Sequence, residues 1–157
     1  MDAYLIVKTL HVISSTVLFG FGAGTAWYFW NAHLTRDPAI IANVGRMVVK
    51  ADWIFTGTSG VIQPASGLWL VYHSGYSLTE PWLLVTYGLY LTAFMCWAPV
   101  VRLQIKAQRL AEQAQQKNES LGSDYEKVMR LWFALGWPAF LGLVTVFWLM
   151  TSKPVLW

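Results

Sequence analysis

The residues of this chain best suited to chemistry are histidines placed near the ends of apolar stretches. His11 lies two helical turns into the first stretch, and Lys8 lies one turn before it on the same helix face. His73 ends the second stretch. Because a haem iron takes axial His or Met ligands from facing helices, His11 is the best candidate ligand and His73 its best histidine partner.

Each of these residues also has a structural alternative. His11 is otherwise expected to be satisfied by a hydroxyl on a neighbouring helix, with three candidates at similar depth: Tyr87, Tyr90 and Thr145. Lys8 either reaches a haem propionate or extends to the outer lipid headgroups. His33, beside Arg36, is expected to be an interfacial side chain and not a ligand.

Other features of the apolar stretches also allow more than one interpretation. The glycines of 20–24 predict either close helix packing or room for a macrocycle against the backbone. Gln63-Pro64 predicts a kink that serves packing, a hinge or a ligand wall. Asp52 is expected to cap the helix of the second stretch, with its charge compensated by Lys50.

The elements that must position these residues are four uncharged stretches. The chain has 157 residues, of which 56% are hydrophobic and 12% charged, whereas an average soluble domain carries about 25% charge. Since roughly 20 apolar residues cross the bilayer core as a helix, the stretches predict four transmembrane spans. They are Tyr4–Trp30, Trp53–Tyr72, Trp82–Val101 and Leu131–Met150.

The predicted fold is a single all-α domain, a four-helix transmembrane bundle over residues 1–157. Nine of the 11 Lys and Arg residues lie in the first and third loops, and the 73–81 loop has none. The positive-inside rule then places both termini outside the cytoplasm, as in a multi-pass protein of the bacterial inner membrane. The helices of spans three and four are expected to extend into the cytoplasm.

Local signals refine this picture. Asp37-Pro38 predicts the start of a cytoplasmic helix that leads into span two. The range 118–123 breaks the helix of span three, and Ser123 with Glu126 has the spacing of a capping box at the start of the next helix. Five tryptophans near the span ends predict aromatic belts: Trp53, Trp82, Trp132, Trp148 and Trp157.

The composition excludes several classes of protein. A disordered chain, a collagen-like chain and a basic nucleic-acid binder do not fit it, so no nucleic-acid partner is expected. One cysteine excludes a disulfide framework and a multi-thiolate metal site. The motifs of zinc proteases, P-loop proteins and nucleophile-elbow hydrolases do not occur.

Lys8-Thr-Leu-His11 resembles the opening motif of the bacterial HemJ-type protoporphyrinogen oxidases, which are small four-helix membrane proteins. The resemblance continues in the glycine-rich middle of span one, in His33, in Gly67-Leu-Trp-Leu and in Arg102. Within this group the chain is similar to an uncharacterised branch, related to the HemJ type and to the CopD-like copper-resistance membrane domains.

The resemblance implies a b-type haem held by His11, as the corresponding histidine is in the HemJ type. The sequence also differs from the HemJ type at two basic residues. The HemJ type carries an arginine late in span one and a lysine in span three, whereas Thr25–Trp30 and Thr86–Phe94 contain no basic residue. If those charges bind porphyrin carboxylates, this protein binds haem without oxidising protoporphyrinogen.

The function expected from the sequence is therefore a haem b-binding membrane protein with a redox or electron-transfer role. His11 and His73 are the expected iron ligands, and Lys8 lies beside the cofactor. The expected partners are the lipid bilayer, a quinone or redox protein, and further copies or a larger complex. The alternatives are a non-catalytic accessory subunit, a protoporphyrinogen oxidase and a copper-handling protein.

Overall fold

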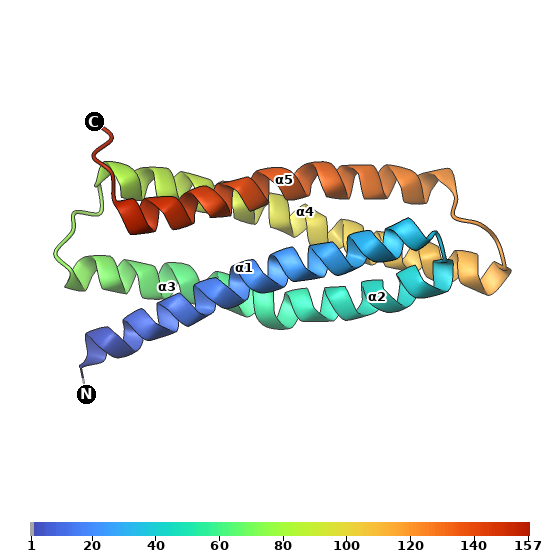
Figure 1. Ribbon diagram of the computed structural model, residues 1–157, viewed down its shortest axis with the longest axis horizontal. Helices are drawn as coiled ribbons and strands as arrows, with labels where there is room; N and C mark the ends of the chain where they lie inside the picture. The colour runs from blue at the N-terminus through green and yellow to red at the C-terminus, as the bar shows by residue number, and fades with distance from the viewer. Residues whose placement is uncertain (1) are drawn as a thin grey trace.

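The computed structural model describes residues 2–157, which form four helical rods (Figure 1). The first rod is α1 (Ala3–Thr35). The second runs without a break through α2 (Pro38–Ala51), the π-helix η1 (Asp52–Gly57) and α3 (Thr58–His73). The third is α4 (Pro81–Lys117) and the fourth is α5 (Ser123–Ser152). The prediction of an all-α fold is confirmed.

Three of these helices are long and apolar enough to cross a membrane: α1, α4 and α5. The second predicted span, Trp53–Tyr72, is different, because η1 interrupts its regular helix. Only the 16 residues of α3 remain, which is slightly fewer than the 17 to 25 or so that a spanning helix needs. The predicted extension of span three is confirmed, since α4 continues to Lys117.

Both ends of the chain lie at the same end of the bundle, together with the connection between α3 and α4 (Figure 1). The turn from α1 to α2 and the connection from α4 to α5 lie at the opposite end. This is the arrangement that the four predicted crossings require. Which end faces the cytoplasm stays a prediction.

The two helix starts predicted from local signals have different outcomes. Asp37 caps α2 as predicted, with its Oδ1 accepting from the Ala39 amide at 2.8 Å and Pro38 in the first turn. The predicted capping box of α5 is wrong: the helix begins at Ser123 without a side-chain cap. The Glu126 carboxylate is instead engaged by the Arg36 guanidinium at the end of α1.

The bundle packs tightly at the α2 end. Gly45 brings α2 against α4 so closely that a Cβ atom there would lie 2.9 Å from Cβ of Gln108. The buried core at this end joins all four rods and comprises Phe29, Ala32, Ile41, Ala42, Val48, Ala107, Ala111, Tyr125, Val128, Met129 and Trp132. His33 is buried here as well, and its Nδ1 lies 3.1 Å from the Tyr125 hydroxyl.

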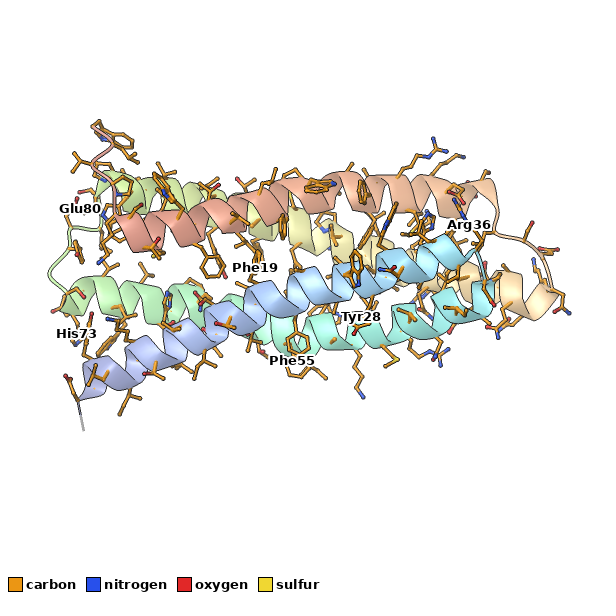
Figure 2. All side chains as sticks on the ribbon, in the orientation of Figure 1. Phe19, Tyr28, Arg36, Phe55, His73 and Glu80 are labelled. Carbon is orange, nitrogen blue, oxygen red and sulfur yellow. The ribbon has the colours of Figure 1, made fainter. Side chains whose placement is uncertain are left out.

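The α3 end is packed more sparsely. Its buried cluster comprises Val71, Trp82, Leu83 and Leu149. Between the two ends, aromatic rings join α1 to α5, and Figure 2 shows Phe19 in the space between these helices. The Phe19 ring stacks on Phe140 at a centroid distance of 5.4 Å and meets the edge of Phe147 at 5.3 Å.

Exposure separates the five tryptophans of the predicted aromatic belts. Trp53, Trp148 and Trp157 are exposed, and for these three the interfacial position stays a prediction. Trp82 and Trp132 are buried inside the bundle, so the prediction is wrong for these two.

Candidate functional site

His11 lies at the contact between α1 and α3. Its Nδ1 is 2.8 Å from the Ser66 hydroxyl, which in turn donates to the Ile62 carbonyl at 2.6 Å. When the Ser66 proton points to the Ile62 carbonyl, the Ser66 oxygen accepts a hydrogen bond from the Nδ1–H of His11. In that tautomer Nε2 of His11 carries the lone pair and has the form that binds a metal ion or accepts a proton.

Two further polar side chains complete this contact. Gln63 Nε2 donates to the His11 carbonyl at 2.7 Å and to the Ser14 hydroxyl. We call His11, Ser14, Gln63 and Ser66 the α1–α3 bridge. Next to Ser66 on α3, a Cβ atom at Gly67 would lie 3.2 Å from Cε1 of His11 and 3.8 Å from its Nδ1. The imidazole is thus fixed by a hydrogen bond and by close packing.

The hydroxyl partners predicted for His11 are wrong. Tyr90 donates to the Gly60 carbonyl at 2.6 Å, and Thr145 donates to the Leu141 carbonyl within its own helix. The Tyr87 hydroxyl has no partner. Ser66 takes this role because α1 packs on α3 at the level of His11. Gln63 likewise serves helix packing, which was one of the uses predicted for it.

The other two predicted site residues lie at the ends of their helices. His73 is exposed, its ring stacks on Trp69 at 3.6 Å, and its Nδ1 is 3.0 Å from the Trp69 carbonyl (Figure 2). Lys8 is also exposed, with its ammonium 5.8 Å from the centroid of the Tyr4 ring. Within residues 2–157, no hydrogen bond or ring contact joins His73 or Lys8 to His11.

A cavity of about 540 Å³ lies further along the bundle, enclosed by α1, the η1–α3 segment, α4 and α5. This volume is within the usual range for small-molecule sites. His11, His73 and Lys8 are not among its lining residues. Ten of the lining residues are aromatic: Phe19, Trp27, Trp30, Tyr90, Phe94, Trp97, Trp132, Phe133, Trp137 and Phe140.

The cavity opens to the outside of the bundle and reaches the backbone of α1. Its rim includes the exposed side chains of Trp27, Val61 and Trp137. In a membrane this outer face is covered by lipid. Gly22 lines the cavity, and a Cβ atom there would have no neighbour within 4 Å. A Cβ atom at Gly20 or Gly24 would also have no neighbour, so the prediction of close packing is wrong for all three glycines, whereas there is open space beside the backbone.

Asp52 is the one carboxylate that lines the cavity. It is only 3% exposed, and its Oδ1 lies 3.1 Å from the hydroxyls of both Thr25 and Thr56. The Gln104 side chain of α4 lies next to it. We call these four residues the Asp52 cluster. No Lys or Arg of the described chain forms an ion pair with Asp52.

The predicted role of Asp52 as a helix cap compensated by Lys50 is wrong. The helix continues through Asp52 into η1, and the Lys50 side chain is exposed. Single turns of π-helix occur often at functional sites. Part of this cluster could have been predicted from the sequence. Asp52 and Thr56 are four residues apart, so they share one helix face.

Three residues of the cavity lining have buried polar atoms that form no hydrogen bond within residues 2–157: Gln104 Oε1, Trp97 Nε1 and Trp132 Nε1. These atoms have almost no accessible surface, so neighbouring side chains enclose them and they are not exposed on the cavity surface. The whole side chains of Gln104 and Trp132 are enclosed, with exposures of 2% and 5%.

Comparisons with known proteins identify a family. A family model described as a predicted integral membrane protein, DUF2269, matches residues 5–154. No curated protein and no solved structure matches the chain. The relation to the HemJ type and to CopD-like domains thus stays a prediction. Because the match covers nearly all of the sequence, this protein is an integral membrane protein of the DUF2269 family.

Proposed function

We propose that this protein binds a lipid-soluble small molecule in the cavity of its bundle. The observation that carries the proposal is the cavity of about 540 Å³, with ten aromatic residues in its lining and an exposed apolar rim. Cavities of this size, lined mainly by apolar and aromatic side chains with a few polar groups, are typical small-molecule sites.

The shape of the cavity favours a ligand that enters sideways from the bilayer. Its exposed apolar rim faces the surroundings of the bundle, and its single carboxylate is enclosed at Asp52. Asp52 and Gln104 flank the ends of the predicted spans Trp53–Tyr72 and Trp82–Val101. This places the polar part of the cavity close to a membrane surface. The site therefore suits a molecule with a polar head and an apolar body.

The proposal is tested by extracting the purified protein with organic solvent and analysing the extract by mass spectrometry. Gly22→Phe fills the cavity, whereas Gly20→Phe places the same side chain outside the lining residues. Both glycines have open space at the Cβ position, so neither change creates an immediate clash there. We expect a lipid-soluble compound other than phospholipid at about one molecule per chain in the wild type and in Gly20→Phe.

The same compound should be lost from Gly22→Phe. Ala139→Phe, on the α5 wall, provides a second filled cavity if Gly22→Phe does not fold. Equal amounts of the compound in all variants, or an extract that contains phospholipid alone, would contradict the proposal.

A second candidate function is haem-based electron transfer at His11, as the HemJ resemblance implies. The tautomer of His11 favours it: Nδ1–H is anchored on Ser66, as in metal-binding histidines, and Nε2 keeps its lone pair. The donor chemistry thus fits one axial position. His73 fits the second axial position less well, because its Nδ1 contacts the Trp69 carbonyl and its ring stacks on the Trp69 ring. A bound haem would supply one-electron transfer, with His11 holding the iron.

The visible spectrum of the detergent-purified protein tests this second function. Haem gives a Soret band and, after reduction, separate α and β bands. His11→Ala should abolish these bands, whereas His33→Ala should retain them because His33 contacts Tyr125 at the other end of α1. A colourless preparation after expression with added haem precursor would contradict haem binding. Copurification with a larger oxidoreductase would instead favour an accessory subunit.

A further inference from the structure

We propose that the outer side of the contact between α2 and α4 binds the head group of an anionic phospholipid. Three exposed basic side chains lie there, Lys50 of α2 and Arg102 and Arg109 of α4, and we call them the α2–α4 seam. The proposal goes beyond the proposed function, because none of the three residues lines the cavity. It follows from the direction of the two helices, the pairing of their charges and the position of the seam along the bundle.

The two helices are in direct contact, and an ion pair marks the outer side of that contact. A Cβ atom at Gly45 of α2 would lie 2.9 Å from Cβ of Gln108 of α4, so little separates the two backbones. Beside this point, the Arg46 guanidinium of α2 bonds the Glu112 carboxylate of α4 at 2.6 Å. Both of these side chains remain partly accessible, which places the pair at the surface of the bundle.

The seam continues from this ion pair toward the middle of the bundle. Since α2 begins and α4 ends at the same end of the bundle, a step from Arg46 to Lys50 and a step from Glu112 to Arg109 lead the same way (Figure 1). Residues three, four or seven apart share a helix face. Lys50 is thus on the face of Arg46, Arg109 is on the face of Glu112, and Arg102 follows Arg109 two turns further along.

The protein supplies no anion for the seam. Within residues 2–157, the ion pairs are those of Arg36, Arg46 and Lys127, and none involves a seam residue. The stretch of α4 between Arg102 and Arg109 contains no acidic residue. Guanidinium groups bind phosphate oxygens through two parallel hydrogen bonds, so the two arginines suit a phosphate group.

The position of the seam favours a lipid phosphate over an acidic protein segment. Lys50 is three residues before Trp53, whose side chain is 59% exposed, and Arg102 directly follows the predicted span Trp82–Val101. Exposed tryptophans and basic residues at the end of an apolar span are typical of the head-group layer. That layer extends roughly 5–7 Å beyond the hydrocarbon core on each side, or about four helical residues. Lys50 and Arg102 fall within it.

Native mass spectrometry of the detergent-purified protein tests the proposal by titration with dioleoylphosphatidylglycerol, which is anionic, and dioleoylphosphatidylcholine, which has no net charge. One basic residue near an anionic membrane surface is worth about a fivefold change in affinity. Lys50→Gln and Arg102→Gln should therefore each weaken binding of the phosphatidylglycerol about fivefold and leave phosphatidylcholine binding unchanged. Arg102→Lys should keep most of the affinity, because it keeps the charge.

Two matched variants remove a positive charge outside the seam. Lys117→Gln lies about 22 Å beyond Arg102 along α4, and Arg130→Gln lies on α5. Both should retain the affinity for phosphatidylglycerol, and Arg109→Gln replaces Lys50→Gln if that variant does not fold. Equal affinity of the wild type for the two lipids, or an equal loss in a control variant, would overturn the proposal. Tighter binding of a polyglutamate peptide than of phosphatidylglycerol would overturn it in favour of an acidic protein partner.

Discussion

The α1–α3 bridge and the Asp52 cluster are both groups of polar side chains inside an apolar bundle, and they differ in how completely they are paired. In the bridge, Ser66 accepts from His11, and Gln63 donates to both the His11 carbonyl and Ser14. In the Asp52 cluster, the carboxylate is paired, but Gln104 Oε1 is not. The bridge has a helix packed against it at Gly67, whereas the cluster faces a cavity.

This difference indicates a division of roles. Hydrogen bonds between membrane helices hold the helices together when both partners belong to the protein. A partly paired polar group in an apolar surrounding is destabilising until something completes it. We therefore assign helix association to the bridge and ligand binding to the cluster. Matched substitutions in the two regions test this assignment.

Two glycine variants should show the largest contrast. Gly67→Val forces side-chain atoms against the His11 ring, which Ser66 prevents from moving away, and should cost about 2–3 kcal/mol of unfolding free energy. Gly22→Val points into the cavity and should change stability by less than about 0.5 kcal/mol, since valine forms helix at least as well as glycine. Unfolding in mixed micelles, followed by circular dichroism, measures both. Equal losses would refute the division of roles.

A pair of glutamine variants separates stability from binding. Gln63→Leu leaves the buried Ser14 hydroxyl with fewer partners and removes the link from α3 to α1, so it should cost about 1–2 kcal/mol. Gln104→Leu removes an acceptor that is already unpaired, but it also removes the amide beside the buried Asp52 carboxylate, so it should cost about 1–2 kcal/mol as well. The ligand should nevertheless be lost from Gln104→Leu and retained by Gln63→Leu, as the extraction experiment can measure. The reverse pattern would place binding at the bridge.

The tautomer of His11 allows a smaller and more specific test. Ser66→Ala removes the acceptor of Nδ1–H and should cost about 1 kcal/mol. In the wild type, ¹⁵N NMR of the imidazole should show the proton on Nδ1, and in Ser66→Ala it should show a mixture of the two tautomers. His73, whose Nδ1 contacts the Trp69 carbonyl, serves as an internal reference that should not change. A proton on Nε2 of His11 in the wild type would remove the support for iron binding there.

Much of the fold could be predicted from the sequence because uncharged stretches and helix caps are local signals. The ranges of α1, α4 and α5 and the start of α2 at Pro38 follow from them. The π-helix that divides the second span could not be predicted from local signals, because it depends on how the rod packs against its neighbours. The capping box of α5 failed for a similar reason: Glu126 finds a stronger partner in Arg36, which is distant in sequence.

The candidate site was harder to predict than the fold. His11 stood out because it is an ionisable group inside an apolar stretch, and it does form a partly buried contact between helices. Asp52 lies at the edge of its stretch, where a carboxylate normally caps a helix. Only the packing of α1 and α4 on η1 brings Thr25 and Gln104 to it. A cavity cannot be predicted from a single sequence, since it depends on how the side chains of four rods pack against one another.

Trp132→Phe should change binding more than its small change in stability explains. The Trp132 indole Nε1–H has no hydrogen bond to lose, but the smaller phenyl ring leaves part of a buried site unfilled, so Trp132→Phe should lower the unfolding free energy of the ligand-free protein by about 1 kcal/mol while keeping the ring edge-on to Phe29. Trp30, which also lines the cavity but is not among the unpaired groups, provides the matched control as Trp30→Phe. If the N–H group serves the ligand, only Trp132→Phe should lower ligand retention, because a phenyl ring fills space but donates no hydrogen bond. Equal retention by both variants would mean that the cavity recognises its ligand by shape alone.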